Sequence, residues 1–234
     1  MDKKKLLYEG KAKKIYLTND EDLVIQDFKD SATAGDGAKK GTIKGKGAIN
    51  NQLSAFLFDY LRSHGIQTHF EKKLSKTSML VKRLEMYKIE VVMRNIAAGS
   101  MVKKYGIEEG TELKQPVLEF YLKDDSLHDP MISNEHAIAF GLASAEEVTE
   151  ISRYAKKINV VLKDFLFRRD LLLVDFKLEF GTQNNIIYLG DEISPDTCRF
   201  WDVETKKKLD KDRFRQDLGG VESAYQEILK RVLG

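Results

Sequence analysis

The alternation of apolar and polar residues divides the first part of the chain into short strand-like segments and one helix. Residues 6–18, LLYEGKAKKIYLT, and 22–30, DLVIQDFKD, have the pattern of strands, with Gly10 at a tight turn inside the first. From Ala48 the apolar residues recur at helical spacing, and Gly65 is a typical helix stop. Three further strands are then predicted, for IQTHF, SMLVKRLEM and IEVVMRN.

Two later segments have the apolar spacing of amphipathic helices. The first begins at Ser144, where SAEE provides a capping box, and continues to about Arg168. The second follows the Gly219-Gly220 break and ends the chain. Residues 29–47 instead hold five glycines and five lysines with few apolar side chains, so we expect a long mobile loop that contributes nothing to a core.

The order of these segments predicts an α+β fold of two lobes. Met86-Tyr87-Lys88 separates two predicted strands, and we place the junction there. Residues 1–86 then form an N-terminal lobe with an antiparallel sheet, and residues 87–234 form a larger C-terminal α+β lobe.

Composition restricts the class of protein. The 39 basic and 37 acidic residues leave a net charge of +2, which provides no global field for gripping nucleic acid. No window approaches the roughly 20 apolar residues of a membrane span, and the N-terminus lacks the apolar core of a signal peptide, so we expect a cytoplasmic protein. The single cysteine, Cys198, excludes an internal disulfide and is interpreted as a small packing residue.

One strand pattern carries an unusual charged face. Residues 171–181 and 186–193 flank the turn cluster TQNN and predict a hairpin, whose first strand places three charges on one face: Asp175, Lys177 and Glu179. With the turn centred near Gln183, Asp191 joins this face, and so do Ile187 and Leu189.

Two interpretations of this face remain open. A half-exposed hairpin would simply have its charged side in water. Alternatively, the neighbouring acids destabilise the fold unless a cation neutralises them, and magnesium carried by a nucleotide meets that need, because it binds one or two carboxylates together with phosphate oxygens.

The first hairpin offers a candidate phosphate site. In YEGKAKKIY, Gly10 permits a tight turn, while Lys11 and Lys13 point to the same side. Such a pair can hold a polyphosphate, although lysines in a surface hairpin are usually solvated charge. The glycine-rich AGDGAKKG does not have the spacing of a Walker A loop.

Several of these blocks occur together in a known family. LYEGKAKKIY, AGDGAKKG followed by KGAINNQLS, VVMRNIAAGSMVKKYGIEEG, HDPM, LVDFKLEFG and GDEISPDTCRFWD resemble, in the same order, the SAICAR synthetase family, from about Leu6 to residue 220. The resemblance implies an ATP-dependent ligase of de novo purine biosynthesis. Such an enzyme joins L-aspartate to the carboxylate of carboxyaminoimidazole ribonucleotide (CAIR), through an acyl phosphate, to give the succinocarboxamide SAICAR, ADP and phosphate.

The family's fold implies an N-terminal lobe like that of protein kinases, a C-terminal lobe like that of ATP-grasp enzymes, and ATP between them. By the same resemblance, adenine lies near Lys82 and Met86, and the phosphates lie near Lys11, Ala12 and Lys13.

The charged face also matches family positions. Glu179 and Asp191 correspond to residues that hold magnesium and the nucleotide. Asp175 and Lys177 correspond to residues beside the reacting groups, and we take both as catalytic. Arg94, Ser100 and Arg199 correspond to substrate-binding residues, and arginine suits a substrate with a phosphate and a carboxylate because its planar fork binds both in a bidentate manner.

The site for L-aspartate is assigned to the lysine-rich loop. Its polar residues could close over the amino acid and keep water from the acyl phosphate: Ser31, Thr33, Asp36, Lys39 and Lys40. His128, before Asp-Pro, is interpreted first as a turn residue and second as a proton-transfer group.

Two other functions compete with the ligase. A small-molecule kinase would share a two-lobed ATP site but lack the amine acceptor, and the HRD and DFG segments of protein kinases are missing in suitable context. An RNA-binding module would use the lysine-rich loop, which lacks interleaved aromatic residues. We therefore expect small-molecule partners, without nucleic acid or membrane, and the sequence leaves a homo-oligomer open.

Overall fold

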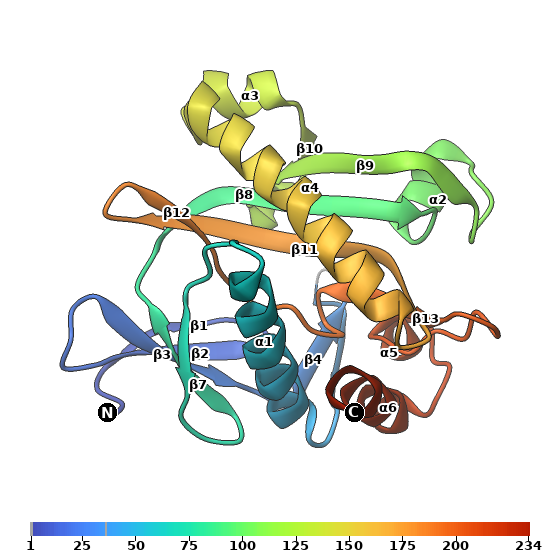
Figure 1. The fold of residues 1–234 in the computed structure, drawn as a ribbon, viewed down its shortest axis with the longest axis horizontal. Helices are drawn as coiled ribbons and strands as arrows, with labels where there is room; N and C mark the ends of the chain where they lie inside the picture. The colour runs from blue at the N-terminus through green and yellow to red at the C-terminus, as the bar shows by residue number, and fades with distance from the viewer. Residues whose placement is uncertain (1, 36) are drawn as a thin grey trace.

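The computed structural model describes residues 2–35 and 37–234. Within these ranges the strands form a five-stranded sheet, a six-stranded sheet and a separate two-stranded hairpin. Figure 1 shows the two larger sheets one above the other, with the strands of residues 85–202 forming the upper one. The fold is therefore α+β with antiparallel strand pairs throughout the named ladders.

The first sheet is built almost entirely from the N-terminal third of the chain. In spatial order its strands are β1 (Leu6–Glu9), β2 (Lys13–Leu17), β3 (Leu23–Phe28), β7 (Ser78–Lys82) and β6 (Phe70–Lys73). The turn predicted at Gly10 is confirmed, because the Gly10 N–H donates to the Lys13 carbonyl at 2.9 Å. Helix α1 (Lys46–Ser63) packs against this sheet. The strand predicted for residues 66–70 is wrong except at Phe70, where β6 begins.

The lysine-rich segment is structured, so the prediction of a long mobile loop is wrong. Strands β4 (Ser31–Ala34) and β5 (Lys39–Thr42) form the two-stranded hairpin. Ala32 lies opposite Gly41, and the small size of Gly41 lets the Phe214 ring approach to within 2.9 Å of the position that a Cβ atom would occupy. Ala32 and Ile43 are buried, so this segment does contribute to the core.

The second sheet has the spatial order β10-β9-β8-β11-β12, and β13 pairs with β11 on the edge away from β8, the same edge as β12. Its strands are β8 (Glu85–Ile96), β9 (Glu112–Leu122), β10 (Met131–Ile132), β11 (Leu171–Gln183), β12 (Ile186–Leu189) and β13 (Cys198–Asp202). The predicted gap between two strands at Met86-Tyr87-Lys88 is wrong, because these residues are part of β8. Met86 pairs with Gly181, and the Lys123 N–H donates to the Lys88 carbonyl.

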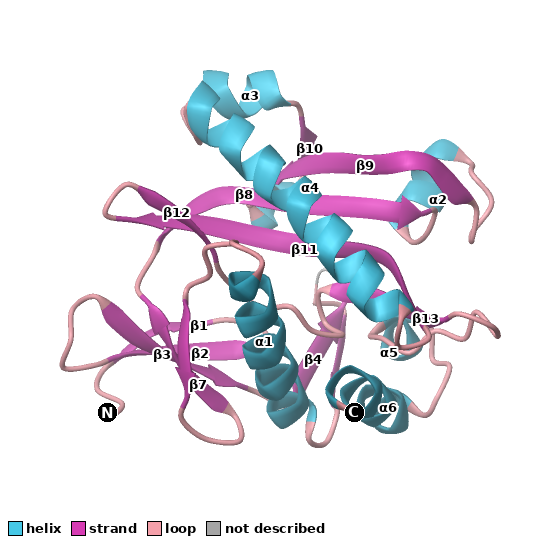
Figure 2. Ribbon diagram, in the orientation of Figure 1, coloured by secondary structure: helices cyan, strands magenta, loops and turns pink. Residues whose placement is uncertain are grey.

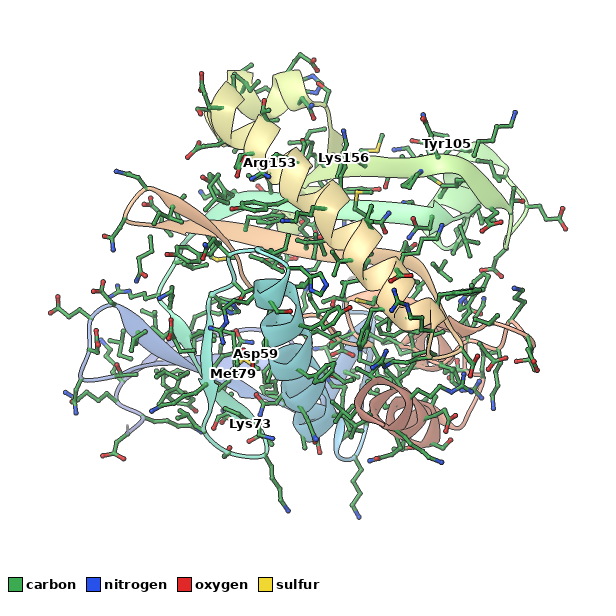
Figure 3. All side chains as sticks on the ribbon, viewed as in Figure 1. Asp59, Lys73, Met79, Tyr105, Arg153 and Lys156 are labelled. Carbon is green, nitrogen blue, oxygen red and sulfur yellow. The ribbon has the colours of Figure 1, made fainter. Side chains whose placement is uncertain are left out.

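The helices cover the sheets from outside. They are α2 (Ser100–Tyr105), α3 (Asn134–Ala139), α4 (Ala145–Phe167), α5 (Asp212–Arg215) and α6 (Val221–Leu233), with a 3₁₀ turn at Asp125–Leu127. Helix α4 crosses one face of the second sheet (Figure 2). Ser144 caps it through the predicted capping box with Glu147. Arg153 and Lys156 are exposed on its outer side (Figure 3). Helix α6 packs against α1, so the end of the chain returns to the N-terminal part.

The predicted hairpin of β11 and β12 is confirmed, but its register differs by three residues. The turn is formed by Asn184 and Asn185, both in the left-handed region that tight hairpin turns require. Thr182 therefore pairs with Ile187, and Phe180 with Leu189. Because an odd shift turns a strand over, the expectation that Ile187 and Leu189 share the charged face is wrong, and both pack with the apolar core.

None of the helices in residues 2–35 and 37–234 is both long and apolar enough to cross a membrane.

Candidate functional site

The predicted charged face of β11 is confirmed, and it is one side of the second sheet. Asp175, Lys177 and Glu179 alternate with Phe176, Leu178 and Phe180, which are buried. Asp175 and Glu179 are only 4% and 6% exposed, so a merely solvated hairpin face does not describe this strand. The face is continued on β8, where Arg94 lies opposite Asp175 and Glu90 lies opposite Glu179.

A cluster of lysines and carboxylates occupies one end of this face. The Lys177 Nζ lies 2.5 Å from Glu179 Oε1, 3.0 Å from Glu90 Oε1 and 3.9 Å from Asp191 Oδ2. Asp191 does not reach it by strand alternation. It follows the end of β12 with φ of 57°, and this turn directs its carboxylate toward Lys177.

The first sheet contributes Lys13 to the same cluster. Its ammonium forms an ion pair with Asp191 and another, at 2.9 Å, with Glu192 Oε1. Lys123 forms an ion pair with Glu179. Each carboxylate thus has a lysine partner, which corrects the expectation that these acids repel one another unless a metal is present. Sequence reasoning missed Glu192 and Lys123, although Glu192 directly follows Asp191 in the GDEISPD block.

Lys177 and Asp191 stay charged at neutral pH. Burial alone would favour the neutral lysine, yet the carboxylates of Glu179, Asp191 and Glu90 hold the pKa of Lys177 well above its ordinary value. Burial likewise opposes the charge of Asp191, but Lys13 and Lys177 hold its pKa below the usual range. Lys177 is therefore a cation that can neutralise an anion rather than a general base.

The carboxylates of Glu179 and Asp191 both lie within 3.9 Å of the Lys177 ammonium. Among the described residues, no group of three or more His, Cys, Asp or Glu side chains is arranged to hold a metal by itself. Two carboxylates nevertheless fit Mg²⁺, which usually takes one or two protein carboxylates and completes its shell with phosphate and water.

A second cluster, rich in arginine, occupies the other end of the face. Asp175 Oδ2 accepts from Arg94 Nη1 at 2.8 Å and from Arg199 Nη1 at 2.8 Å. Arg94 Nη2 also donates to Ser100 Oγ at 3.1 Å. The structure therefore brings together the three residues predicted to bind substrate, with Asp175 between the two arginines. A carboxylate shared by two guanidinium groups is suited to orienting them.

Three further side chains support these arginines and were missed from the sequence. Glu119 accepts from Arg94 Nε at 2.7 Å, and the Tyr121 hydroxyl donates to Glu119 at 2.8 Å. Asp212 accepts from Arg199 Nε at 2.8 Å. Glu119 and Tyr121 alternate along β9, a strand that the sequence reasoning did not recognise.

The other residues predicted to bind the nucleotide lie in or beside the first sheet, except Met86, which belongs to β8. Lys11 Nζ lies 3.0 Å from Asp125 Oδ1, and the Ala12 carbonyl accepts from a backbone N–H at 2.8 Å in the turn before β2. Lys82 pairs with Glu71 at 2.6 Å. Met86 lines a cavity of about 420 Å³ together with Lys88 of β8 and with Lys123, which follows the end of β9.

Of the residues assigned to L-aspartate, Lys39 contacts α5 and the segment that follows it. Lys39 donates to the Phe214 carbonyl and to Asp217, both at 2.6 Å, so it fastens the small hairpin to α5. Asp36 lies outside the described residues. His128 follows the 3₁₀ turn with φ of 57°, as its interpretation as a turn residue requires.

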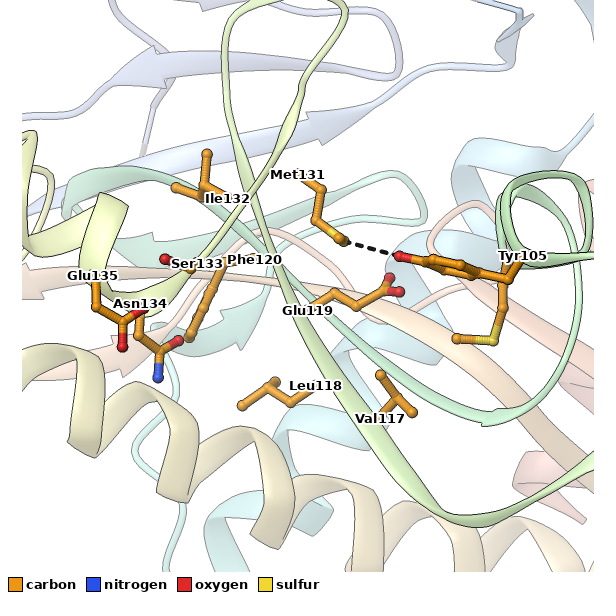
Figure 4. A pocket seen from close by; sticks show the side chains of 11 residues that line it. Tyr105, Val117, Leu118, Glu119, Phe120, Met131, Ile132, Ser133, Asn134 and Glu135 are labelled. Atoms are coloured by element: carbon orange, nitrogen blue, oxygen red, sulfur yellow. Dashed lines mark hydrogen bonds between the residues drawn. The ribbon is translucent and has the colours of Figure 1, made fainter.

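A larger cavity, of about 560 Å³, opens at the edge of β9 (Figure 4). Glu119 and Tyr105 line it, and the Tyr105 hydroxyl contacts the sulfur of Met131 at 3.9 Å. Through Glu119 this cavity adjoins the arginine cluster.

Known proteins share the sequence and the fold across the whole chain. The family model described as SAICAR synthetase matches residues 6–232. The phosphoribosylaminoimidazole-succinocarboxamide synthase of Chlorobium limicola is 60% identical, and the match covers 100% of this chain and 99% of that protein.

Solved structures agree with this match. The synthase of the same name from Ehrlichia chaffeensis superposes with a TM-score of 0.96 at 45% identity, covering 97% of this chain and 98% of that one. A SAICAR synthetase in complex with ADP superposes with a TM-score of 0.94 at 51% identity, covering 96% of each chain. This protein therefore belongs to the SAICAR synthetase family of enzymes.

Proposed function

We propose that this enzyme uses ATP to join L-aspartate to the carboxylate of CAIR, giving SAICAR, ADP and phosphate in purine biosynthesis. The observation that carries the proposal is the pair of clusters on one sheet face. Lysines and carboxylates lie at one end, suited to a nucleotide polyphosphate, and arginines lie at the other, suited to a substrate with a phosphate and a carboxylate. The relative bound to ADP and the names of the close relatives support it.

The reaction needs an activated carboxylate, because an oxide ion is a poor leaving group. An oxygen of the CAIR carboxylate attacks the γ-phosphorus while the bond to ADP breaks. The aspartate amine then attacks the acyl carbon, phosphate departs with the bonding electrons, and the nitrogen loses a proton. Phosphoryl transfer depends mainly on alignment and charge neutralisation, which Lys13 and Lys177 supply.

Glu179 and Asp191 would hold magnesium, which when bound supplies further neutralisation of phosphate charge. The lysines that contact these two carboxylates already fix their positions. Lys82 and Met86 lie where adenine is proposed to bind, and Lys11 and Ala12 belong to the turn proposed to cover the phosphates.

Arg94, Ser100 and Arg199 are proposed to bind the ribonucleotide. Asp175 is better suited to orient the two arginines than to accept a proton, because both guanidinium groups donate to it. Its proposed catalytic contribution is therefore the alignment of substrate beside Lys177. For L-aspartate, the hairpin with Asp36 and Lys39 stays a proposal, supported by its attachment to α5 near the arginine cluster.

We also propose that the enzyme acts in the cytoplasm on these small molecules, independently of nucleic acid and membranes, and the nearly balanced charge supports this. The proposed lobes meet near residue 86. The chain passes from the first sheet to the second between Lys82 and Glu85, which supports that division.

The test is ADP release with substrates added singly and together. We expect release only when ATP, CAIR and L-aspartate are all present, with one SAICAR formed for each ADP. Sustained ADP release with CAIR alone, unaffected by L-aspartate, would instead support a small-molecule kinase and overturn the proposal.

A further inference from the structure

Charged side chains of alternating sign form a line across the second sheet and onto α5. In order they are Glu119, Arg94, Asp175, Arg199, Asp212 and Arg215. Adjacent members approach within 2.5 to 2.8 Å, and successive strands β9, β8, β11 and β13 contribute the first four. Arg94 and Arg199 are consequently each held by two carboxylates, and Arg215 by one.

Asp212 is the last carboxylate in this line and has no assigned role. Its residue is 1% exposed, and its two oxygens serve different arginines. Oδ2 accepts from Arg199 Nε at 2.8 Å, and Oδ1 accepts from Arg215 Nη1 at 2.5 Å. Burial opposes the charge of Asp212, but Arg199 and then Arg215 hold its pKa below the ordinary value, so it stays an anion at neutral pH.

The two carboxylates around Arg199 occupy two different edges of its guanidinium plane. Asp212 takes Nε, and Asp175 takes Nη1 at 2.8 Å. A guanidinium held at one point can rotate about that contact, whereas two contacts on different edges fix the plane. Asp212 thus determines where the remaining N–H groups of Arg199 point.

Arg199 Nη2, which neither carboxylate contacts, lies against Gly99, the residue before Ser100. A Cβ atom placed on Gly99 would lie 2.4 Å from Arg199 Nη2, so the guanidinium rests directly against the backbone there. Ser100 in turn accepts from Arg94 at 3.1 Å. The two arginines therefore reach adjacent residues, Arg199 at Gly99 and Arg94 at Ser100.

We propose that Asp212 is a positioning residue for the ligase reaction. It fixes Arg199 so that Nη2 lies against Gly99, beside Ser100, where an anionic group of the ribonucleotide binds. This inference rests on the proposed function. Asp212 touches no reacting atom and acts through Arg199.

The test compares Asp212→Asn with wild type in steady-state kinetics, direct ribonucleotide binding by calorimetry, and thermal unfolding. The amide replaces one acceptor oxygen with a donor that faces an arginine. We expect KM and Kd for CAIR to rise about 10- to 100-fold, the scale of one charge-assisted hydrogen bond, while KM for ATP changes less than about twofold. Unchanged affinity for CAIR in a folded Asp212→Asn protein would overturn the proposal.

A double-mutant cycle separates positioning from general stability. If Asp212 acts through Arg199, then adding Asp212→Asn to Arg199→Lys should weaken CAIR binding little further. Losses that multiply in the double variant would contradict the proposal. If Asp212→Asn does not fold, Asp212→Glu keeps the charge but displaces the oxygens by one methylene, and normal CAIR binding by that variant would also contradict it.

Asp202→Asn is the matched control. Asp202 lies at the far end of β13 and pairs with Arg231 Nη1 at 2.9 Å, away from the charged face. Its loss should affect unfolding but not CAIR affinity, and an equal loss of affinity would count against a specific role for Asp212. If wild-type enzyme released ADP without any dependence on L-aspartate, the proposed function would be refuted. The proposal for Asp212 would still be tested separately, because calorimetry measures CAIR binding directly.

Discussion

The two clusters on the sheet face neutralise their buried carboxylates with different cations, lysine in one and arginine in the other. In the lysine cluster, Lys13 from the first sheet meets Asp191 and Glu192 beyond β12. In the arginine line, Arg94 and Arg199 belong to the second sheet and share Asp175. An ammonium is a compact charge on a flexible stem, whereas a guanidinium is a planar fork with fixed donor directions. The arginine line therefore has fixed donor directions, whereas the lysine cluster depends on charge more than on direction.

Removing the central lysine should have the largest effect. Lys177→Met leaves Glu90, Glu179 and Asp191 without their shared ammonium. Turnover should fall by about two to three orders of magnitude, the scale for a lost preorganised charge. The free energy of unfolding should fall by about 1.5–3 kcal/mol, because charge-assisted hydrogen bonds from Lys177 are lost while Lys123 and Lys13 still pair with Glu179 and Asp191.

ADP release and urea unfolding measure these two losses. Lys156→Met, on the exposed side of α4, makes the same chemical change and should alter the free energy of unfolding by less than about 0.5 kcal/mol. Near-normal turnover in Lys177→Met would show that the lysine cluster is structural only.

Replacing an arginine by lysine tests whether direction matters at the other end. Arg199→Lys keeps the charge, but one ammonium cannot reproduce the two edges that Asp175 and Asp212 now bind. We expect the KM for CAIR to rise about 10- to 100-fold, equivalent to about 1.5–3 kcal/mol, with little change for ATP. Arg231→Lys, away from the face, is the control. If both variants bound CAIR as tightly as wild type, the fixed donor directions of the Arg199 guanidinium would not matter for binding.

The smallest effect on turnover is expected at Asp210, beside the arginine line. Its carboxylate accepts from the backbone N–H groups of Phe200 and Asp212. Burial, and then the charge of Asp212, raise its pKa to about 7, against the opposing effect of Arg199 and Arg215. The folded protein thus keeps this proton between pH 4 and 7, where an ordinary unfolded Asp has lost it.

Asp210 makes the folded protein less stable as the pH rises from 4 to 7. Stability from Asp210 is present below the ordinary Asp pKa and is lost as the pH rises toward 7. Asp210→Asn, which cannot ionise, should flatten the decline of stability over this interval while changing turnover only slightly. Urea unfolding at pH 5, 6, 7 and 8 checks this. A decline that is equally steep in the variant would place its origin in other groups.

Local patterns predicted the side-chain sorting of β11 and the limits of α4. Strand alternation alone placed Asp175, Lys177 and Glu179 on one face, and the capping box marked Ser144. The family resemblance then identified Arg94 and Arg199, which neighbouring strands bring to the same carboxylate. Their roles in binding stay predictions.

The missing parts depend on contacts between distant segments. Pro116 interrupts the pattern of β9, since proline cannot complete a strand ladder, and so concealed Glu119 and Tyr121. The hairpin register depended on which two residues form the turn. The lysine partners of Asp191 and Glu179 come from 178 and 56 residues away, a separation that no short motif reports.

Strand β11 also fixes the distance between the arginine line and the lysine cluster. Asp175 belongs to the arginine line and Glu179 to the lysine cluster, and four residues of extended chain separate them by about 13 Å. Inserting two residues between them would preserve which face each occupies but lengthen that separation by about 7 Å. The number of residues between Asp175 and Glu179 therefore sets the distance between the arginine line and the lysine cluster. Insertions should be tolerated far better at the Asn184-Asn185 turn than inside β11.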